Sequence, residues 1–338
     1  MKKQKGYIDV LKLFFAVGVV AIHTLCFAGT DTPSWLFMHA VLRLAVPFFF
    51  CVSGYFFYKS LKKEKNPIST RNKYLKRLLP PYLFWLAVNL PLVIIQYAMR
   101  GDGLKEIILK VGRGFLFYPW GALWYVLALI VAILIIVPFY QRKKLKTITI
   151  IGLVLYLIGL VFNTYYFLVD GTALQKGVDT ILLITASMRN GIFEGLFFVA
   201  TGMYVAKFEE TKKITRRACL ISFLISYVIL IIEILLTKNL AHTDDHSLFI
   251  SFVFVIPSLV MLLSKYNTSF KSTTFRNYST GIYFSHRFIL ALLSILVFGV
   301  TERTDIAPYV FLTTLTIDVI MLAILYKINN EKINHLIS

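Results

Sequence analysis

Ten apolar runs, each of about 20 residues, constrain the fold of this chain more than any other feature. A helix needs about 20 apolar residues to cross the hydrocarbon core of a bilayer. Because that core holds no water, a spanning segment must satisfy its backbone hydrogen bonds internally, as a helix does. We therefore predict an all-α polytopic membrane protein with about ten transmembrane helices. The predicted helices cover residues 7–27, 38–58, 75–98, 122–140, 147–168, 190–206, 217–237, 247–265, 279–299 and 307–327.

The composition agrees with this interpretation and argues against a nucleic-acid-binding protein. Hydrophobic residues make up 58% of the 338 residues, whereas soluble domains average roughly 45–50% apolar residues. The net charge is +19, but the basic residues flank the apolar runs, where they act as topology signals and contact lipid head groups. The three cysteines, Cys26, Cys51 and Cys219, fall within apolar runs, so we expect neither a disulfide framework nor a metal site.

The distribution of basic residues predicts which side of the membrane each loop faces. With the N-terminus in the cytoplasm, the inward segments carry 25 of the 36 Lys and Arg residues and the outward segments carry eight. Cytoplasmic loops are enriched in Lys and Arg, so both termini are predicted to be cytoplasmic. The first apolar run is longer than the core of a signal peptide and no small-residue cleavage motif follows it, so we expect it to be the first transmembrane helix.

Two further segments are predicted to be amphipathic helices at the membrane surface. Residues 104–118 are too short and too charged to span, but their apolar residues recur at helical spacing. Residues 172–188 are similar. The sequence contains no internal repeat and no low-complexity linker, so we expect a single membrane domain over residues 1–338.

The first predicted helix contains three ionisable residues, Asp9, Lys12 and His23. Such residues are costly inside a bilayer and usually persist there for pairing or function. Eleven residues, or about three helical turns, separate Lys12 from His23, so both side chains face the same side about 16 Å apart. His23 could act as a general base in the outer half of the membrane, or it could be an ordinary interior histidine. Asp9 and Lys12 are three residues apart and could simply pair with each other.

Arg43 and Glu194 are two further charges within predicted helices. A guanidinium is always charged, so Arg43 at that depth needs a carboxylate, a cluster of carbonyl groups or an anionic substrate. Pro47 interrupts the hydrogen-bond ladder of the same helix. Glu194 is a candidate partner for Arg43 or His23, and the sequence does not distinguish the two. Four other ionisable residues in or near apolar runs are expected to be structural: Glu233, His286, Arg287 and Asp318.

A basic segment, RNKYLKRLLPPY, precedes the third predicted helix on the side expected to be cytoplasmic. Arg71, Lys73, Lys76 and Arg77 concentrate positive charge there. Clustered Lys and Arg match phosphate oxygens, so these residues are candidates for binding a nucleotide phosphate. The alternative is that they only flank the helix and fix its orientation.

Taken together, these segments resemble the acyltransferase-3 family. The first helix of that family carries a basic residue, then ten residues and a His, which fits Lys12 and His23. RLAVPFFFCVSGYFF resembles its second helix, and KYLKRLLPPY resembles its basic loop. Of the family's two arginines three residues apart, Arg77 fits the second, whereas Tyr74 stands at the first. GALWYVLALI, RNGIFEGLFFVATGMYVAK and STGIYFSHRFIL resemble later segments, so the likeness extends over about residues 7–290.

The resemblance implies a membrane-bound O-acyltransferase in a bacterial plasma membrane. Family members are thought to take an acyl group, usually acetyl, from acyl-CoA in the cytoplasm and to pass it to a hydroxyl of a cell-envelope glycan or another acceptor. On this basis His23 is expected to act as the general base or to carry the acyl group briefly, with Arg43 and Glu194 as further catalytic candidates. The acyl-CoA, a co-substrate and not a permanently bound cofactor, is expected to contact Lys12, Arg71, Lys73, Lys76 and Arg77.

Other functions agree with parts of the sequence. The membrane domains of vancomycin-resistance serine racemases resemble the same family and are linked to serine supply across the membrane, and VVAIHT at 19–24 would suit them. Those proteins carry a soluble racemase domain after the membrane part. A secondary transporter would be expected to have inverted repeats and paired broken helices, which the sequence lacks. A scaffolding protein would leave His23 and the basic loop without a purpose. No motif specifies the acceptor, the acyl length or a homo-oligomeric state.

Overall fold

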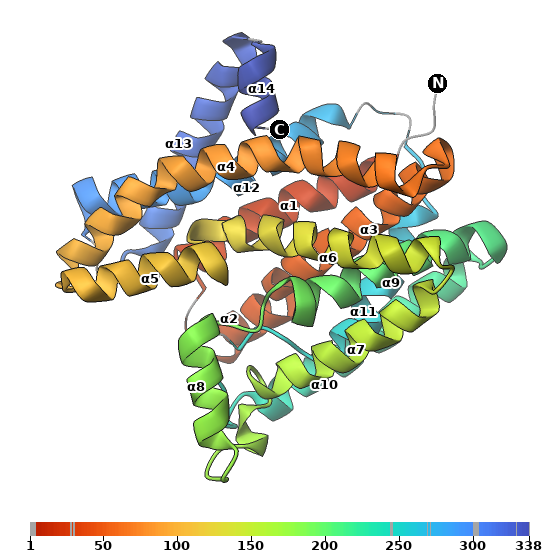
Figure 1. Ribbon diagram of the computed structural model, residues 1–338, viewed down its shortest axis with the longest axis horizontal. Coiled ribbons are helices and arrows are strands. Elements are labelled where there is room, and N and C mark those ends of the chain that lie inside the picture. Colours follow the sequence, from red (N-terminus) through yellow and green to blue (C-terminus); the bar gives the residue numbers. More distant parts are fainter. Residues whose placement is uncertain are drawn as a thin grey trace.

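The computed structural model describes residues 5–27, 29, 31–243, 246–268, 270, 272–299, 304–328 and 330–337. Within these residues the regular structure is helical, which confirms the all-α prediction. Figure 1 shows α1, α3 and α6 running across the middle of the molecule, with α13 and α14 rising at the upper left. The α-helices are α1 (Gly6–His23), α2 (Thr32–Leu36), α3 (Ala45–Glu64), α4 (Pro67–Met99), α5 (Leu104–Leu116), α6 (Trp124–Gln141), α7 (Leu145–Val161), α8 (Gln175–Thr185), α9 (Leu196–Thr211), α10 (Arg216–Thr237), α11 (Phe252–Ser264), α12 (Thr273–Leu293), α13 (Ala307–Ile328) and α14 (Glu331–Ile337).

Each of the ten predicted spans contains a helix in the structure. In the described part of the chain, eight helical segments are long and apolar enough to cross a bilayer, which confirms the polytopic character. The other two, α7 and α11, are apolar but have only 17 and 13 residues. The predicted amphipathic helices at 104–118 and 172–188 correspond to α5 and α8.

The number of crossings and the cytoplasmic location of the termini stay predictions. Some of the basic residues that support this orientation lie outside the side chains that the structure describes, namely Lys2, Lys3, Lys271, Arg303 and Lys332.

The second predicted helix, residues 38–58, is not one continuous α-helix. It begins with a π-helical turn, η1 (Phe37–Val41), tightens into a 3-10 turn, η2 (Leu42–Leu44), and continues as α3. Pro47 lacks a backbone N–H, so the carbonyl group of Arg43 cannot accept the usual hydrogen bond from four residues further on. The regular α-helical hydrogen bonding is thus interrupted at Arg43, which is predicted to belong to the site. π-Helical turns such as η1 are frequent at functional sites.

The helices α3 and α9 pack closely against each other in the core. Glycines at the contact allow this approach, because a methyl group on Gly54 would lie 2.0 Å from the carbonyl oxygen of Val199. A methyl group on Gly202 would lie 1.8 Å from the carbonyl oxygen of Cys51. The two backbones are therefore in near contact, and the pair forms a rigid support for the turns that carry the site.

The C-terminal helix α14 folds back onto the long helix α4. The indole nitrogen of Trp85 on α4 donates a hydrogen bond to the carbonyl oxygen of Leu336 (2.9 Å). Ile337 is buried in the same apolar cluster. The last described residues of the chain therefore belong to the packed core around α4 and α12.

Candidate active site

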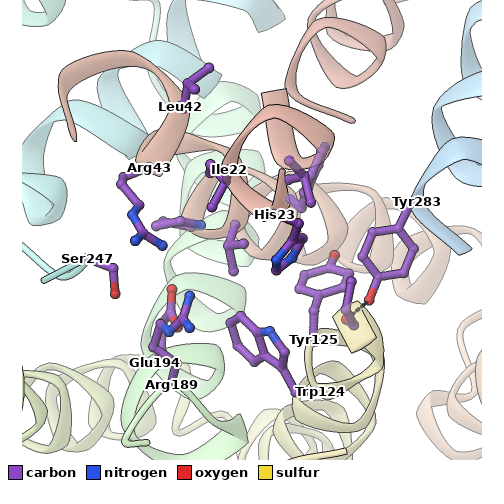
Figure 2. A pocket seen from close by; sticks show the side chains of 15 residues that line it. Ile22, His23, Leu42, Arg43, Trp124, Tyr125, Arg189, Glu194, Ser247 and Tyr283 are labelled. Carbon is purple, nitrogen blue, oxygen red and sulfur yellow. Dashed lines mark hydrogen bonds between the residues drawn. The ribbon is translucent and has the colours of Figure 1, made fainter. Parts of the chain in front are cut away.

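A small cavity of about 40 Å³ collects the three side chains predicted to be catalytic, and we call it the central cavity. His23, Arg43 and Glu194 reach it from three different elements: the end of α1, η2 and a π-helical turn, η5 (Gly191–Gly195). Figure 2 shows Arg43 and Glu194 pointing toward each other, with the imidazole of His23 in the same space. This volume is far below the roughly 300–1,000 Å³ that is typical of pockets for small molecules, so the central cavity can hold reacting groups and not a whole substrate.

His23 is the last residue of α1. Its imidazole ring stacks on that of His286 from α12, with 5.5 Å between the ring centroids and 22° between the planes. His286 is fully buried, and its Nδ1 donates a hydrogen bond to the carbonyl oxygen of Ile282 (2.7 Å). In the neutral ring the other nitrogen, Nε2, is then the acceptor. The candidate catalytic histidine therefore has a second histidine of fixed orientation beside it.

Glu194 is held at the wall of the central cavity by the turn η5. Its exposed fraction is only 1%. Asn190 caps the turn, because its side-chain oxygen accepts hydrogen bonds from two backbone N–H groups (2.9 and 3.1 Å). Gly191 allows close packing on α6, since an added Cβ would lie 2.7 Å from the carbonyl oxygen of Ala128. A polar cap and a small residue thus place a carboxylate deep inside the molecule.

A second guanidinium, that of Arg189, also lines the central cavity. It lies 4.9 Å from a ring centroid of Trp124 and donates a hydrogen bond to the hydroxyl of Tyr118 (2.8 Å). The rings of Tyr118 and Trp124 stack with their centroids 5.6 Å apart. In the sequence, Arg189 lies in a segment predicted to face outward, where basic residues commonly flank helices. Its place at the site results from the packing of the turn η5 against α6.

A larger cavity of about 680 Å³, the basic cavity, contains part of the predicted donor site. Lys12, Lys73 and Arg77 line it. Arg71 and Lys76 are not among its lining residues. Helical geometry explains the difference, because residues 73 and 77 are four apart and share one face of α4, whereas residues 71 and 76 lie on other faces.

The basic cavity also contains cations that the sequence analysis did not single out. Arg276 from α12 lines it, together with Lys5 and Lys59. Glu209 binds the ammonium groups of both lysines, at 3.4 Å from Lys5 and 3.1 Å from Lys59. Burial lowers the pKa of Lys5, and the attraction of Glu209 opposes this shift. Arg276 belongs to a segment predicted to be cytoplasmic, where basic residues are common for reasons of topology, so the sequence alone does not indicate its place in the cavity.

A third cavity, of about 490 Å³, shares lining residues with both the basic cavity and the central cavity. It shares several basic residues with the former, including Lys12 and Arg77. It shares Phe49, Tyr125 and Tyr283 with the latter. The rings of Tyr125 and Tyr283 lie edge to face, with 5.5 Å between centroids and 72° between planes. We call this cavity the aromatic passage, because the three rings stand where it meets the central cavity.

A fourth cavity, of about 350 Å³, lies beyond His23 and is called the vestibule here. It shares Ile22 and His23 with the central cavity. Two arginines line it, Arg100 after the end of α4 and Arg287 on α12. The basic cavity, the aromatic passage, the central cavity and the vestibule thus form a series in which each cavity shares lining residues with the next. His23 lines the last two.

The family of the chain follows from its sequence over nearly its whole length. The sequence profile of the acyltransferase domain matches residues 5–325. The chain belongs to the acyltransferase-3 family. It is 30% identical over 237 residues to a serine/alanine racemase of Enterococcus gallinarum, which covers 68% of the chain and 33% of that relative. It is 27% identical over 271 residues to an amino-acid racemase of Enterococcus faecalis, which covers 78% of the chain and 37% of that relative.

The chain of this acyltransferase-3 protein spans about a third of the length of the curated racemases that it matches. No solved structure matches it. The family assignment agrees with the resemblance seen in the motifs, including the relation to serine racemases.

Other ionisable residues in the apolar runs of this acyltransferase-3 protein divide into two groups. Glu233 accepts hydrogen bonds from the hydroxyl of Tyr165 (2.7 Å) and from two backbone N–H groups before α11 (2.6 and 2.8 Å), which fits the structural role expected for it. Asp318 accepts a hydrogen bond from a buried serine hydroxyl, which also fits. His286 lies beside His23 and Arg287 lies on the vestibule wall, so the structural role expected for them stays a prediction.

Proposed function

We propose that this chain is a membrane O-acyltransferase that moves an acyl group, acetyl in the simplest case, from acyl-CoA to a hydroxyl of a cell-envelope glycan or a similar acceptor. The observation that supports this proposal is the succession of basic cavity, aromatic passage, central cavity and vestibule, which share lining residues. A donor that enters from one end and an acceptor that enters from the other would meet at His23.

The basic cavity and the aromatic passage suit the two parts of acyl-CoA. Lys12, Arg77 and Arg276 line both cavities and offer positive charge to the phosphates of the nucleotide. The pantetheine arm is slender and carries no charge, so it can pass between aromatic rings. The rise of α1 between Lys12 and His23 is about 16 Å, which an extended pantetheine arm can bridge. The thioester would then lie in the central cavity.

Acyl transfer in the central cavity needs a base and a site for the developing oxyanion. The acceptor hydroxyl oxygen attacks the thioester carbonyl carbon while His23 takes the hydroxyl proton. The guanidinium of Arg43 or Arg189 stabilises the negative charge that forms on the carbonyl oxygen. When the C–S bond breaks, the imidazolium of His23 returns the proton to the thiolate of CoA. The products are the ester of the acceptor and free CoA.

The remaining groups of the central cavity support this chemistry. Glu194 supplies negative charge next to the guanidiniums of Arg43 and Arg189, and buried charges are stable only where they are compensated. His286 stacks on His23 and fixes the orientation of its ring. The acceptor reaches His23 from the vestibule, which keeps it apart from the phosphates of the donor.

A second candidate function is that of the membrane part of a serine racemase, which would supply serine across the membrane. The identity to racemases over most of this chain favours it. In that case the cavities would conduct an amino acid and no acyl-CoA would be needed. Uptake of radiolabelled serine into proteoliposomes without acyl-CoA would support this function, and its absence would remove it.

The acyltransferase proposal is tested with the purified protein in lipid nanodiscs and radiolabelled acetyl-CoA. We expect binding of CoA and transfer of label to hydroxyl groups of envelope polymers, identified by mass spectrometry. His23→Gln should lower the transfer rate by about 100-fold or more, because a general base contributes roughly 10²–10⁴-fold. The affinity for CoA and the melting temperature should stay close to those of the wild type.

His335→Gln provides a matched control, because His335 is exposed on α14 and does not line the cavities. It should leave transfer unchanged. Full transfer by folded His23→Gln protein would refute the catalytic role of His23, and the absence of CoA binding by the wild type would refute the acyltransferase proposal.

A further inference from the structure

The proposed acceptor would lie in the vestibule, so the residues that line the vestibule indicate the chemical class of that acceptor. Its volume of about 350 Å³ falls in the range of roughly 300–1,000 Å³ that is typical of pockets for small molecules. Its lining includes His23, so a hydroxyl bound there can reach the candidate base. It does not share the lysines and arginines of the basic cavity. The side chains of the vestibule are therefore expected to bind the acceptor and not CoA.

The charges of the vestibule are positive. Arg100 and Arg287 come from different helices and both line it. The other described lining residues include no carboxylate. Guanidinium groups remain charged at any physiological pH, and a cleft lined by one sign of charge attracts ligands of the opposite sign.

Arg287 is held in place close to the candidate base. It follows His286, whose ring stacks on His23. Gly121, at a positive φ of 72°, lies against the stem of Arg287, because a Cβ built on this glycine would be 3.4 Å from the Cβ of Arg287. The stem of Arg287 is thus packed close to the residues that carry the imidazole, and its guanidinium lies on the same cavity.

Two buried or half-buried amides complete the polar wall of the vestibule. Asn89 uses its side-chain nitrogen to bind the carbonyl oxygen of Trp85 (2.7 Å). Gln96 uses its side-chain nitrogen to bind the hydroxyl of Ser294 (2.6 Å). Each amide keeps a carbonyl oxygen that can accept a hydrogen bond from a hydroxyl of a ligand. The vestibule thus combines cations with acceptors for hydroxyl groups.

We propose that the acceptor carries an oxyanion, a carboxylate or a phosphate ester, close to the hydroxyl that receives the acyl group. Arg100 and Arg287 bind the oxyanion, and the amides of Asn89 and Gln96 bind neighbouring hydroxyls. This arrangement directs the reacting hydroxyl to His23. The inference rests on the proposed function and specifies the chemical class of its acceptor.

The test compares pairs of hydroxyl compounds in which one member carries an anionic group in place of a neutral hydroxymethyl or hydroxyl group. D-Glucuronate is paired with D-glucose to test a carboxylate, and glycerol 3-phosphate is paired with glycerol to test a phosphate ester. Calorimetry on the wild-type protein in nanodiscs measures binding, and radiolabelled acetyl-CoA measures transfer. One anionic member should bind at least about tenfold more tightly than its neutral partner, as expected for a charge-assisted contact. The pair that shows the preference identifies the type of oxyanion.

Arg287→Gln and Arg100→Gln should each lower the affinity for the preferred anion by about tenfold and leave the affinity for the neutral partner and for CoA unchanged. Lys105→Gln is the control, because it removes an exposed cation from the nearby start of α5 that does not line the vestibule. It should change none of these affinities.

The outcomes separate this inference from the proposed function. Equal binding of both members of each pair, or no binding of any of them, overturns the inference. Equal transfer to neutral and anionic compounds overturns it and leaves the acyltransferase proposal intact. A preference for the anion that Arg287→Gln abolishes, without transfer to any compound, supports the oxyanion site and counts against acyl transfer.

Discussion

At the scale of single residues, position on a helix face decides which cation of α4 contributes to the basic cavity. Arg77 lines the basic cavity and the aromatic passage, whereas its neighbour Lys76 lines neither. We predict that Arg77→Gln raises the KM for acyl-CoA by about tenfold or more, because it removes a charge-assisted contact to phosphate worth roughly 1.5–3 kcal/mol. Steady-state kinetics in nanodiscs measures the change.

Lys76→Gln is the comparison for this prediction, because it removes one positive charge from the adjacent position. It should alter the KM for acyl-CoA by less than about twofold, since Lys76 lines neither the basic cavity nor the aromatic passage. Equal effects of the two substitutions would show that the donor responds to the general charge of the segment and not to the cavity.

The sequence predicts those site residues that are unusual for their surroundings. Lys12, His23, Arg43 and Glu194 are conspicuous because they are ionisable groups in apolar runs, and the structure places three of them around one cavity. Arg189 and Arg276 stand next to helix ends, where basic residues are common for reasons of topology. Only the packing of helices distinguishes a flanking charge from one that enters a cavity.

At the scale of elements, apolar runs predict where helices lie, but they do not predict where an α-helix gives way to a π-helical or 3-10 turn. Arg43 and Glu194 both lie on turns that are not α-helical, η2 and η5. A π-helical or 3-10 turn changes the direction of its side chains without changing the composition of the run. Pro47 was a visible cause for the first turn, whereas the second depends on close packing of Gly191 against α6.

The contact between α3 and α9 gives a prediction about stability. Gly202→Ala should destabilise the protein by about 3 kcal/mol and lower the melting temperature by about 5 °C or more, because the added methyl group meets the backbone of α3. Backbone atoms cannot move aside as the end of a flexible side chain can. Thermal unfolding of the protein in detergent, followed by its tryptophan fluorescence, measures the change.

Gly112→Ala on α5 serves as the matched substitution. An added Cβ at Gly112 has no described neighbour within 4 Å, so it should leave stability unchanged or raise it by up to about 1 kcal/mol through helix propensity. A melting temperature of Gly202→Ala equal to that of the wild type would contradict the close approach of α3 and α9.

At the scale of the whole molecule, the proposed reaction requires the basic cavity to face the cytoplasm, where acyl-CoA is made. The charge distribution predicts that the turn after α6 is cytoplasmic and that the loop before α8 is outside. We therefore expect alkaline phosphatase, which is active only outside the cytoplasm, to be inactive when fused after Lys143 and active when fused after Gly171. Green fluorescent protein fused at the same two positions should give the opposite pattern. Activity of the phosphatase after Lys143 would reverse the orientation and exclude a cytoplasmic donor.

The narrowness of the central cavity has a consequence for the bilayer itself. Larger cavities on both sides of it could together form a leak through which ions would discharge the membrane. The central cavity between them has a free volume of only about 40 Å³, and the side chains of Arg43 and Arg189 line it. A hydrated sodium ion or a hydronium ion would have to pass this narrow space beside two fixed positive charges and one negative charge, that of Glu194. The excess of positive charge in a space of low dielectric is the kind of barrier that excludes cations from other pores. In the proposed reaction, reagents from two compartments would therefore meet at one imidazole while the electrochemical gradient is preserved.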